Sequence, residues 1–232
     1  MGKRIITQRR GRGTFTYKVR KKAFRFKLQY SSNLKGEGEI IKLFNSSAHT
    51  APLAKVKYEK GSFYIPAAKG MFEGQKIKLE GKEISSGNIL QLKNIPVKTS
   101  VYCIEARPGD GGKFIKSGGN SAIVNRISKD FVSIVFPSKK EKKLNLNCRA
   151  IIGEIAGAGR LEKPIIKAGK KYHLKKAKSK LWPRTSAVKM NVIDHPFGSG
   201  RAKNVKSKIA KRNAPPGRKV GLLRPKRTGK KK

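Results

Sequence analysis

The sequence predicts a mainly β fold in which two small β-barrels follow one another, with long basic extensions at both ends. Short runs of β-branched and aromatic residues alternate with glycine-containing turns from residue 36 to about residue 156, a pattern typical of small barrels. The acidic residues are confined to the same region, because twelve of the thirteen lie between Glu37 and Glu162. At 232 residues, the chain can hold one large domain or two small ones.

The two terminal segments are strongly basic. The first 36 residues contain twelve Lys and Arg and no acid, and the last 70 contain twenty-four and a single acid, Asp194. A folded domain usually carries both signs of charge on its surface, so these ends are expected to lie against a polyanion. Nucleic acid is favoured over an anionic membrane, because Gly and Pro interrupt any long amphipathic helix.

The sequence also indicates the compartment. No apolar run approaches the roughly 18 residues of a transmembrane helix, and the basic N-terminus lacks the apolar stretch of a signal peptide. A disulfide between Cys103 and Cys148 is possible in principle, but two buried free thiols in a reducing compartment are favoured. We therefore expect a soluble, cytoplasmic protein.

Residues 1–36 form the expected basic N-terminal extension. From Phe24 to Leu28, apolar and basic residues alternate with a period of two, which would place them on opposite faces of an extended segment. Two interpretations remain open: an edge strand that packs its aromatic rings on a domain, or rings that stack on bases beside phosphate contacts. The aromatic residues of the extension are Phe15, Tyr17, Phe24, Phe26 and Tyr30.

Residues 37–96 are expected to form the first barrel. Glycines at close spacing separate five short candidate strands, and Pro96 ends the set. Five such strands within about 60 residues are typical of a small closed barrel. The strands are expected at 39–44, 53–58, 62–65, 76–79 and 89–92.

Residues 97–172 are expected to form the second barrel and the start of a short helix. The turn-rich loop 107–113 is not a Walker phosphate loop, because Arg107 and Phe114 stand where that motif needs Gly and Ser or Thr. Such a turn can still bring backbone N–H groups to RNA phosphates. The strands are expected at 101–105, 121–127, 131–136, 144–146 and 150–155.

Residues 173–232 are expected to form an extended basic tail. One short basic helix is predicted over 170–181, and beyond Trp182 and Pro183 the recurring Gly and Pro exclude further helix. This segment buries too little apolar surface to fold alone, so we expect it to become ordered on its partner. Trp182 either stacks on a base or anchors the helix to the second barrel.

Catalysis and metal binding are not expected. The three histidines, His49, His173 and His195, are scattered and have no Cys or acidic cluster at metal-ligand spacing. Asp194 is adjacent to His195 in sequence, which does not place its carboxylate well to orient the imidazole ring. We therefore assign no catalytic residue and no metal ligand.

Several motifs of the chain resemble those of one known family. The loop 190–200 (MNVIDHPFGSG) and the downstream GRKVG at 217–221 are highly specific, and the resemblance spans nearly the whole chain. It is to the universal large-subunit ribosomal protein family called L-two, in its archaeal and eukaryotic form. The chain departs from the family at Val192, where Pro is usual, and at Ser199, where Gly is usual. The other matching segments are 51–56 (APLAKV), 105–122 (EARPGDGGKFIKSGGNSA), 149–173 (RAIIGEIAGAGRLEKPIIKAGKKYH) and 214–223 (APPGRKVGLL) with 227–229 (RTG).

The resemblance implies an OB-like barrel followed by an SH3-like barrel, with both extensions threaded into large-subunit rRNA. It implies contacts with other ribosomal proteins and with the small subunit, and support of the peptidyl-transferase region. No cofactor is implied, although Mg²⁺ held by the RNA is expected nearby. The histidine matching His195 was once proposed to take part in peptide-bond formation, but here it is carried over as an RNA contact.

Two alternatives to a structural ribosomal role stay open at this point. His195 could participate in peptidyl transfer, which would make the chain an enzyme component. The chain could instead be a free nucleic-acid chaperone or DNA-compacting protein. The residues expected to contact RNA are mostly cations of the extensions together with the 190–201 loop: Arg9, Arg10, Arg12, Arg20, Lys21, Lys22, Arg25, Lys113, Lys175, Lys176, Lys180, Trp182, Arg184, Met190, Asn191, Asp194, His195, Pro196, Phe197, Gly198, Arg201, Arg212, Arg218, Lys219, Arg224 and Arg227.

Overall fold

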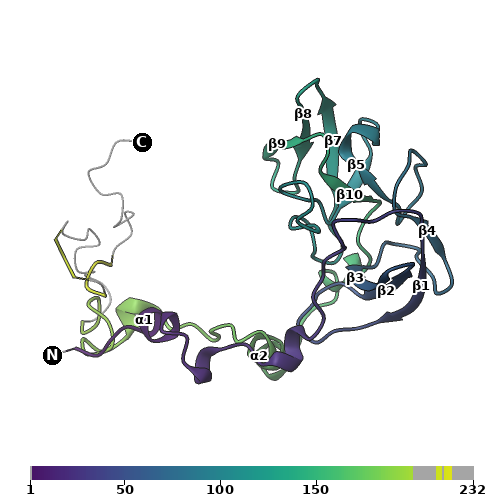
Figure 1. Cartoon of the computed structure of the whole chain (residues 1–232). Coiled ribbons are helices and arrows are strands. Elements are labelled where there is room, and N and C mark those ends of the chain that lie inside the picture. Colours follow the sequence, from purple (N-terminus) through teal and green to yellow (C-terminus); the bar gives the residue numbers. More distant parts are fainter. Residues whose placement is uncertain (1, 201–212, 216, 221–232) are drawn as a thin grey trace. The chain divides into compact units, whose positions relative to one another are not determined.

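The computed structural model describes residues 2–200, 213–215 and 217–220 (Figure 1). The prediction of a mainly β fold is confirmed, and the strands form two antiparallel sheets. The chain divides into two compact units, which are considered separately. The central unit comprises residues 20–171, and the terminal unit combines 1–19 with 172–232.

The first sheet of the central unit has four strands in the order β3-β2-β1-β4. Burial alternates at the start of β1, where Gly38 and Ile40 are buried and Glu37 and Glu39 are exposed. Gly38 is needed for close packing, because a Cβ there would lie 2.9 Å from Cγ1 of Val56. The strands are β1 (Glu37–Phe44), β2 (Leu53–Tyr58), β3 (Gly61–Pro66) and β4 (Lys76–Lys78).

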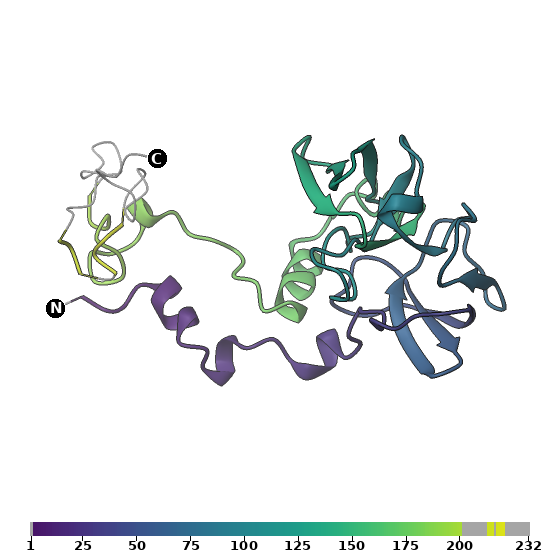
Figure 2. The ribbon, with the colours of Figure 1, turned by 45° about the horizontal axis from the view of Figure 1, so that its top comes forward.

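The second sheet has six strands in the order β5-β10-β6-β7-β8-β9. Figure 2 shows the strands of the central unit, in blue and teal, from a second direction. All its neighbouring strands pair antiparallel. Short 3-10 helices η3 (Leu92–Asn94) and η4 (Ala158–Arg160) follow β5 and β10. The strands are β5 (Ile89–Gln91), β6 (Ser100–Tyr102), β7 (Ala122–Ile127), β8 (Phe131–Val135), β9 (Glu141–Asn145) and β10 (Arg149–Ile152).

Strand β5 corrects the expected membership of the first strand set. It forms where the sequence predicts a strand, but it pairs with β10 in the second sheet and not with the strands of 37–78. The physical reason is that both of its faces are buried. Ile89 packs in the first hydrophobic core and Leu90 in the second, so neither face distinguishes one sheet from the other in the sequence.

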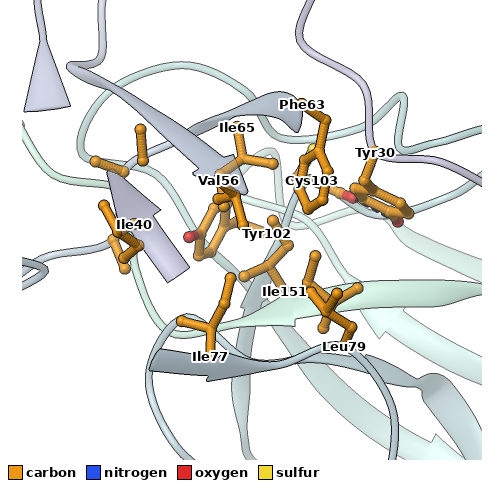
Figure 3. Packing of buried hydrophobic residues seen from close by; sticks show 14 of the residues in the cluster. Tyr30, Ile40, Val56, Phe63, Ile65, Ile77, Leu79, Tyr102, Cys103 and Ile151 are labelled. Carbon is orange, nitrogen blue, oxygen red and sulfur yellow. Dashed lines mark hydrogen bonds between the residues drawn. The ribbon is translucent and has the colours of Figure 1, made fainter. Parts of the chain in front are cut away.

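Two neighbouring strands of the second sheet share this property with β5. Tyr102 and Ile151 belong to the first core, whereas Val101 and Ile152 belong to the second. Figure 3 shows Tyr102 and Ile151 among side chains of the first core. Strands β5, β6 and β10, called the shared strands below, therefore separate two cores and contribute to both.

The N-terminal extension is shorter than expected. Residues 20–36 belong to the central unit, where Leu28, Tyr30 and Leu34 are buried. Leu28 and Gln29 each form an isolated β-bridge with Tyr64. The expected extended run at 24–28 is only partly present, because its first residue, Phe24, is the last residue of the 3-10 helix η2 (Lys21–Phe24). Burial of the apolar side chains of Leu28, Tyr30 and Leu34 explains why this basic segment is folded.

The terminal unit contains little regular structure. Its elements include α1 (Ile6–Gly11) and the 3-10 helices η1 (Phe15–Tyr17) and η5 (Ala187–Lys189). The helix predicted over 170–181 is present as α2 (Ala168–Ala177), which has no buried residue. In the part of the chain that the structure describes, no helix is long and apolar enough to cross a membrane.

Candidate RNA interface

In the terminal unit, residues 3–17 contact residues 179–193. The backbone N–H of Lys3 donates to the carbonyl of Ile193 at 2.8 Å, and the hydroxyl of Ser179 donates to the carbonyl of Tyr17 at 2.8 Å. The Arg10 guanidinium donates to the Ser179 carbonyl and lies 5.3 Å from the Tyr17 ring centroid. These contacts join segments that are more than 160 residues apart in sequence.

The loop 190–200 has a defined backbone structure. Its two arms are joined by a hydrogen bond from the Ser199 N–H to the Met190 carbonyl at 3.1 Å. The Gly198 N–H donates to the His195 carbonyl at 2.8 Å. A Cβ on Gly198 would lie 2.3 Å from the Asn191 carbonyl carbon and oxygen, so any side chain would force the two arms apart. Gly198 is therefore required by close backbone approach.

The His195 ring is oriented within this loop. Its Nδ1 accepts a hydrogen bond from the Phe197 N–H at 3.1 Å, and its ring meets that of Phe197 edge-on at 5.1 Å. Burial lowers the pKa of His195 below its ordinary value, so the ring is neutral at pH 7. Because Nδ1 accepts, the ring proton sits on Nε2. His195 thus presents a hydrogen-bond donor, which suits an RNA acceptor better than it suits a general base.

Asp194, the only acid of the last 70 residues, contacts the other end of the chain. Its Oδ1 lies 3.9 Å from Nζ of Lys3, and both side chains are substantially exposed. Within the described residues the second ion pair joins Lys78 and Glu83. Most Lys and Arg side chains among the described residues therefore have no carboxylate partner. The surface they form is a strong attractor for polyanions.

The predicted RNA-contacting residues are distributed over both units, and most of the cations are exposed. Arg201, Arg212, Arg224 and Arg227 lie outside the described residues. The exposed ones in the central unit are Arg20, Lys21, Lys22, Arg25 and Lys113. The exposed ones in the terminal unit are Arg9, Arg12, Lys175, Lys176, Lys180, Arg184, Asn191 and Arg218. Those partly buried are Arg10, Trp182, Met190, Asp194, His195, Pro196, Phe197 and Lys219, and Gly198 is buried.

The glycine-rich loop 107–113 does not offer its backbone to phosphates as a cradle. The Asp110 carboxylate accepts from the N–H groups of Ala106, Arg107 and Gly112 at 3.0 to 3.2 Å. The fully buried Glu105 accepts from the N–H groups of Gly111 and Arg149. Carboxylates of the protein already accept hydrogen bonds from these backbone N–H groups. The N–H groups are therefore not available to bind RNA phosphates, although the sequence had suggested this for the turn.

A second group of cations was not apparent from the sequence. Lys35, Lys60 and Arg149 come from three separate segments and line one cleft of about 440 Å³ in the central unit. The Arg149 guanidinium donates to the Ser32 carbonyl at 2.7 Å, which fixes it at the edge of this cleft. Lys35 follows the buried 28–34 segment, Lys60 lies in the turn between β2 and β3, and Arg149 begins β10, so only the fold brings these residues together.

The two cysteines of the described residues are buried and unreactive. Cys103 and Cys148 are buried free thiols, as predicted. Burial raises the pKa of Cys103 to about 12 and that of Cys148 to about 11, so both are protonated at neutral pH. Within the described residues, no group of three His, Cys, Asp or Glu could hold a metal ion.

Comparison with known proteins agrees with this architecture. Residues 85–217 match the family model described as "Ribosomal Proteins L2, C-terminal domain". The chain is 47% identical to the "Large ribosomal subunit protein uL2" of Archaeoglobus fulgidus, covering 99% of both chains. It is 41% identical to the protein of the same name from Methanothermobacter thermautotrophicus, covering 100% of both chains. The chain therefore belongs to the ribosomal protein L2 family and is of the archaeal type.

Proposed function

We propose that this chain binds large-subunit ribosomal RNA as a structural, non-enzymatic constituent of the large ribosomal subunit. The supporting observation is the basic surface of the two units, where most cations of the described residues have no carboxylate partner. Family membership supports the ribosomal assignment, because relatives that match over their whole length carry the name of a large-subunit protein. The site of action is accordingly the ribosome in the cytoplasm.

RNA binding would be driven by phosphate neutralisation. Lys and Arg displace condensed counterions from the RNA, so the affinity depends steeply on salt. If about ten phosphates are contacted, the logarithm of affinity falls with a slope of roughly −7 to −9 against the logarithm of salt concentration. Magnesium ions held by the RNA would lie near these contacts without protein ligands.

The loop 190–200 contributes shape to this interface as well as charge. The Nε2–H of His195 would donate to a phosphate or base acceptor of the RNA, and the closed backbone of the loop would follow the RNA surface. By this contact, the chain would support the peptidyl-transferase region. Elsewhere on its surface, the chain would contact other ribosomal proteins and the small subunit. Donation from Nε2–H to RNA accounts for the tautomer of His195 and requires no part for the ring in peptide-bond formation.

The test is salt-dependent binding of large-subunit rRNA by the full-length chain. The segment 201–232 contains fourteen Lys and Arg, and replacing them with Gln should lower the magnitude of the salt slope by several units. The control replaces two exposed lysines, Lys139 and Lys140, and should change the slope by about two at most. An unchanged slope in the tail variant would show that the tail does not supply the affinity.

The same preparation separates a ribosomal role from that of a free DNA-compacting protein. A ribosomal constituent should co-sediment with large subunits and prefer rRNA to duplex DNA at matched salt. A DNA-compacting protein should bind duplex DNA as tightly as rRNA and stay free of the subunits. Equal affinity together with no co-sedimentation would therefore contradict the proposal.

A further inference from the structure

A second cleft of the central unit differs in chemistry from the rest of the basic surface. It has a volume of about 840 Å³ and lies between η2 with the residues after it and the loop that follows β1. Three cations line it, Lys21, Lys22 and Arg25. Phe24 and Phe26 also line it, and no carboxylate is among its described lining residues. Aromatic faces next to unpaired cations distinguish this cleft from a simple charged patch.

One aromatic wall of the cleft is held in place by the loop behind it. The Ala48 N–H donates to the Ala23 carbonyl at 3.2 Å, and both of these alanines are buried. The Phe24 ring meets His49 edge-on at 5.1 Å, and Nδ1 of that histidine lies 2.8 Å from the Ser46 hydroxyl. The Phe24 ring thus has a fixed orientation while remaining 47% exposed.

The other aromatic wall is fixed by the first sheet. Phe26 packs against Phe44 at 4.6 Å and against Tyr64 at 4.9 Å between ring centroids. The Arg25 guanidinium lies 5.8 Å from the Phe26 ring centroid. Both rings are therefore in place before any ligand arrives, which lowers the entropic cost of binding a flat group.

Polar groups complete the lining. Asn45, Ser46 and Ser47 contribute an amide and two hydroxyls, which can donate to and accept from the edge of a base. An aromatic face, a polar edge reader and cations for phosphate are the three elements with which proteins bind unpaired nucleotides. An acidic peptide would use the cations but would leave the exposed ring of Phe24 without a flat partner.

We propose that this cleft binds one unstacked nucleotide of single-stranded RNA. The base lies against the exposed face of Phe24, its edge meets Asn45 and Ser46, and its phosphates are neutralised by Lys21 and Lys22. This inference rests on the proposed function for the source of the RNA, namely an unpaired nucleotide of rRNA. Duplex RNA does not fit, because its bases remain stacked inside the helix.

The test compares single-stranded with duplex RNA on the full-length chain. The probes are an oligoadenylate of about 12 nucleotides and an RNA duplex of about the same length, at raised salt to weaken the phosphate contacts. Phe24→Leu keeps an apolar side chain but removes the aromatic face. It should weaken oligoadenylate binding about 5- to 50-fold and change duplex binding less than about 2-fold.

Phe72→Leu is the matched control. Phe72 is 62% exposed in the same unit but lies beside Glu73, outside the cleft lining. It should change neither affinity by more than about 2-fold, and circular dichroism of both variants verifies the fold. If Phe24→Leu behaves like Phe72→Leu, or weakens both probes equally, the nucleotide site is wrong.

A second measurement needs no substitution. Ultraviolet cross-linking of the wild-type chain to oligoadenylate should yield a nucleotide adduct on Phe24 or on its cleft neighbours. Because the first three acids are Glu37, Glu39 and Glu59, cleavage after glutamate releases the cleft in two peptides for sequencing by mass spectrometry: 1–37, which contains Phe24, and 40–59, which contains Asn45, Ser46 and Ser47. Cross-links confined to other regions would overturn the cleft assignment while leaving the proposed function intact. Loss of salt-dependent rRNA binding by the wild type would instead contradict the proposed function.

Discussion

Two buried tyrosines of the first core should respond in opposite directions to the same substitution. The Tyr30 hydroxyl lies 3.1 Å from the carbonyl oxygens of both Cys103 and Arg149, to which it can donate. The Tyr102 hydroxyl is buried and has no hydrogen-bond partner among the described residues. Phenylalanine removes only the oxygen in each case, so the pair isolates the effect of hydrogen bonding on the free energy of unfolding.

The magnitudes follow from the two environments. Removal of the unsatisfied Tyr102 hydroxyl relieves a desolvation penalty of about 1–3 kcal/mol. The cavity left by one oxygen costs only about 0.2 kcal/mol, taking about 10 Å³ at about 24 cal/mol per Å³. Tyr102→Phe should therefore stabilise the chain by about 1–3 kcal/mol. Tyr30→Phe should destabilise it by about 1 kcal/mol, because a buried hydrogen bond is lost.

Urea unfolding of the full-length chain, followed by far-ultraviolet circular dichroism of the sheets, measures both effects. With a slope of about 2 kcal/mol per M, the midpoints of the two variants should differ by about 1–2 M. A destabilised Tyr102→Phe variant would refute the reasoning, because it would show that this hydroxyl makes a favourable contact. Equal midpoints for the two variants would do the same.

Three further predictions concern the loop and the thiols. Gly198→Ala should weaken rRNA binding at least several-fold, because its Cβ would separate the two arms of the loop; filter binding at fixed salt measures this. The pKa of His195 in the free chain, read from NMR titration, should lie below the ordinary histidine value. Since the unfolded chain then binds the proton more tightly, loop stability should fall as the pH drops below that ordinary value, and a raised pKa would contradict the burial argument. Cys103 should react with a thiol reagent only on unfolding, so rapid labelling of the native chain would show that it is accessible.

The sequence predicted the strands well because their burial alternates or is continuous over short runs. Strand β2 occupies the expected residues 53–58, and α2 overlaps the expected helix. Which sheet a strand joins was less predictable. Ile89 and Leu90 are equally apolar, and their division between two cores depends on contacts with distant residues of β10.

The candidate interface was predictable in its charge but not in its geometry. The absence of acids identified the basic segments, and this required only the composition. The contact of Lys3 with Ile193 and the joining of Lys35, Lys60 and Arg149 depend on long-range packing, which leaves no local pattern. For residues 20–36, in contrast, charge was misleading. The basic composition suggested an exposed arm, but burial of Leu28, Tyr30 and Leu34 makes this segment part of the folded central unit.

The shared strands have a consequence for how the central unit folds. A strand whose two faces belong to different cores cannot leave one core without uncovering the other, so the two sheets should unfold as a single cooperative transition. A fragment that ends at residue 96 would lose Tyr102, Cys103, Ile151 and Ile155 from the first core. The two sheets thus form one folding unit, which cannot be divided at the loop between β5 and β6 without disrupting both cores.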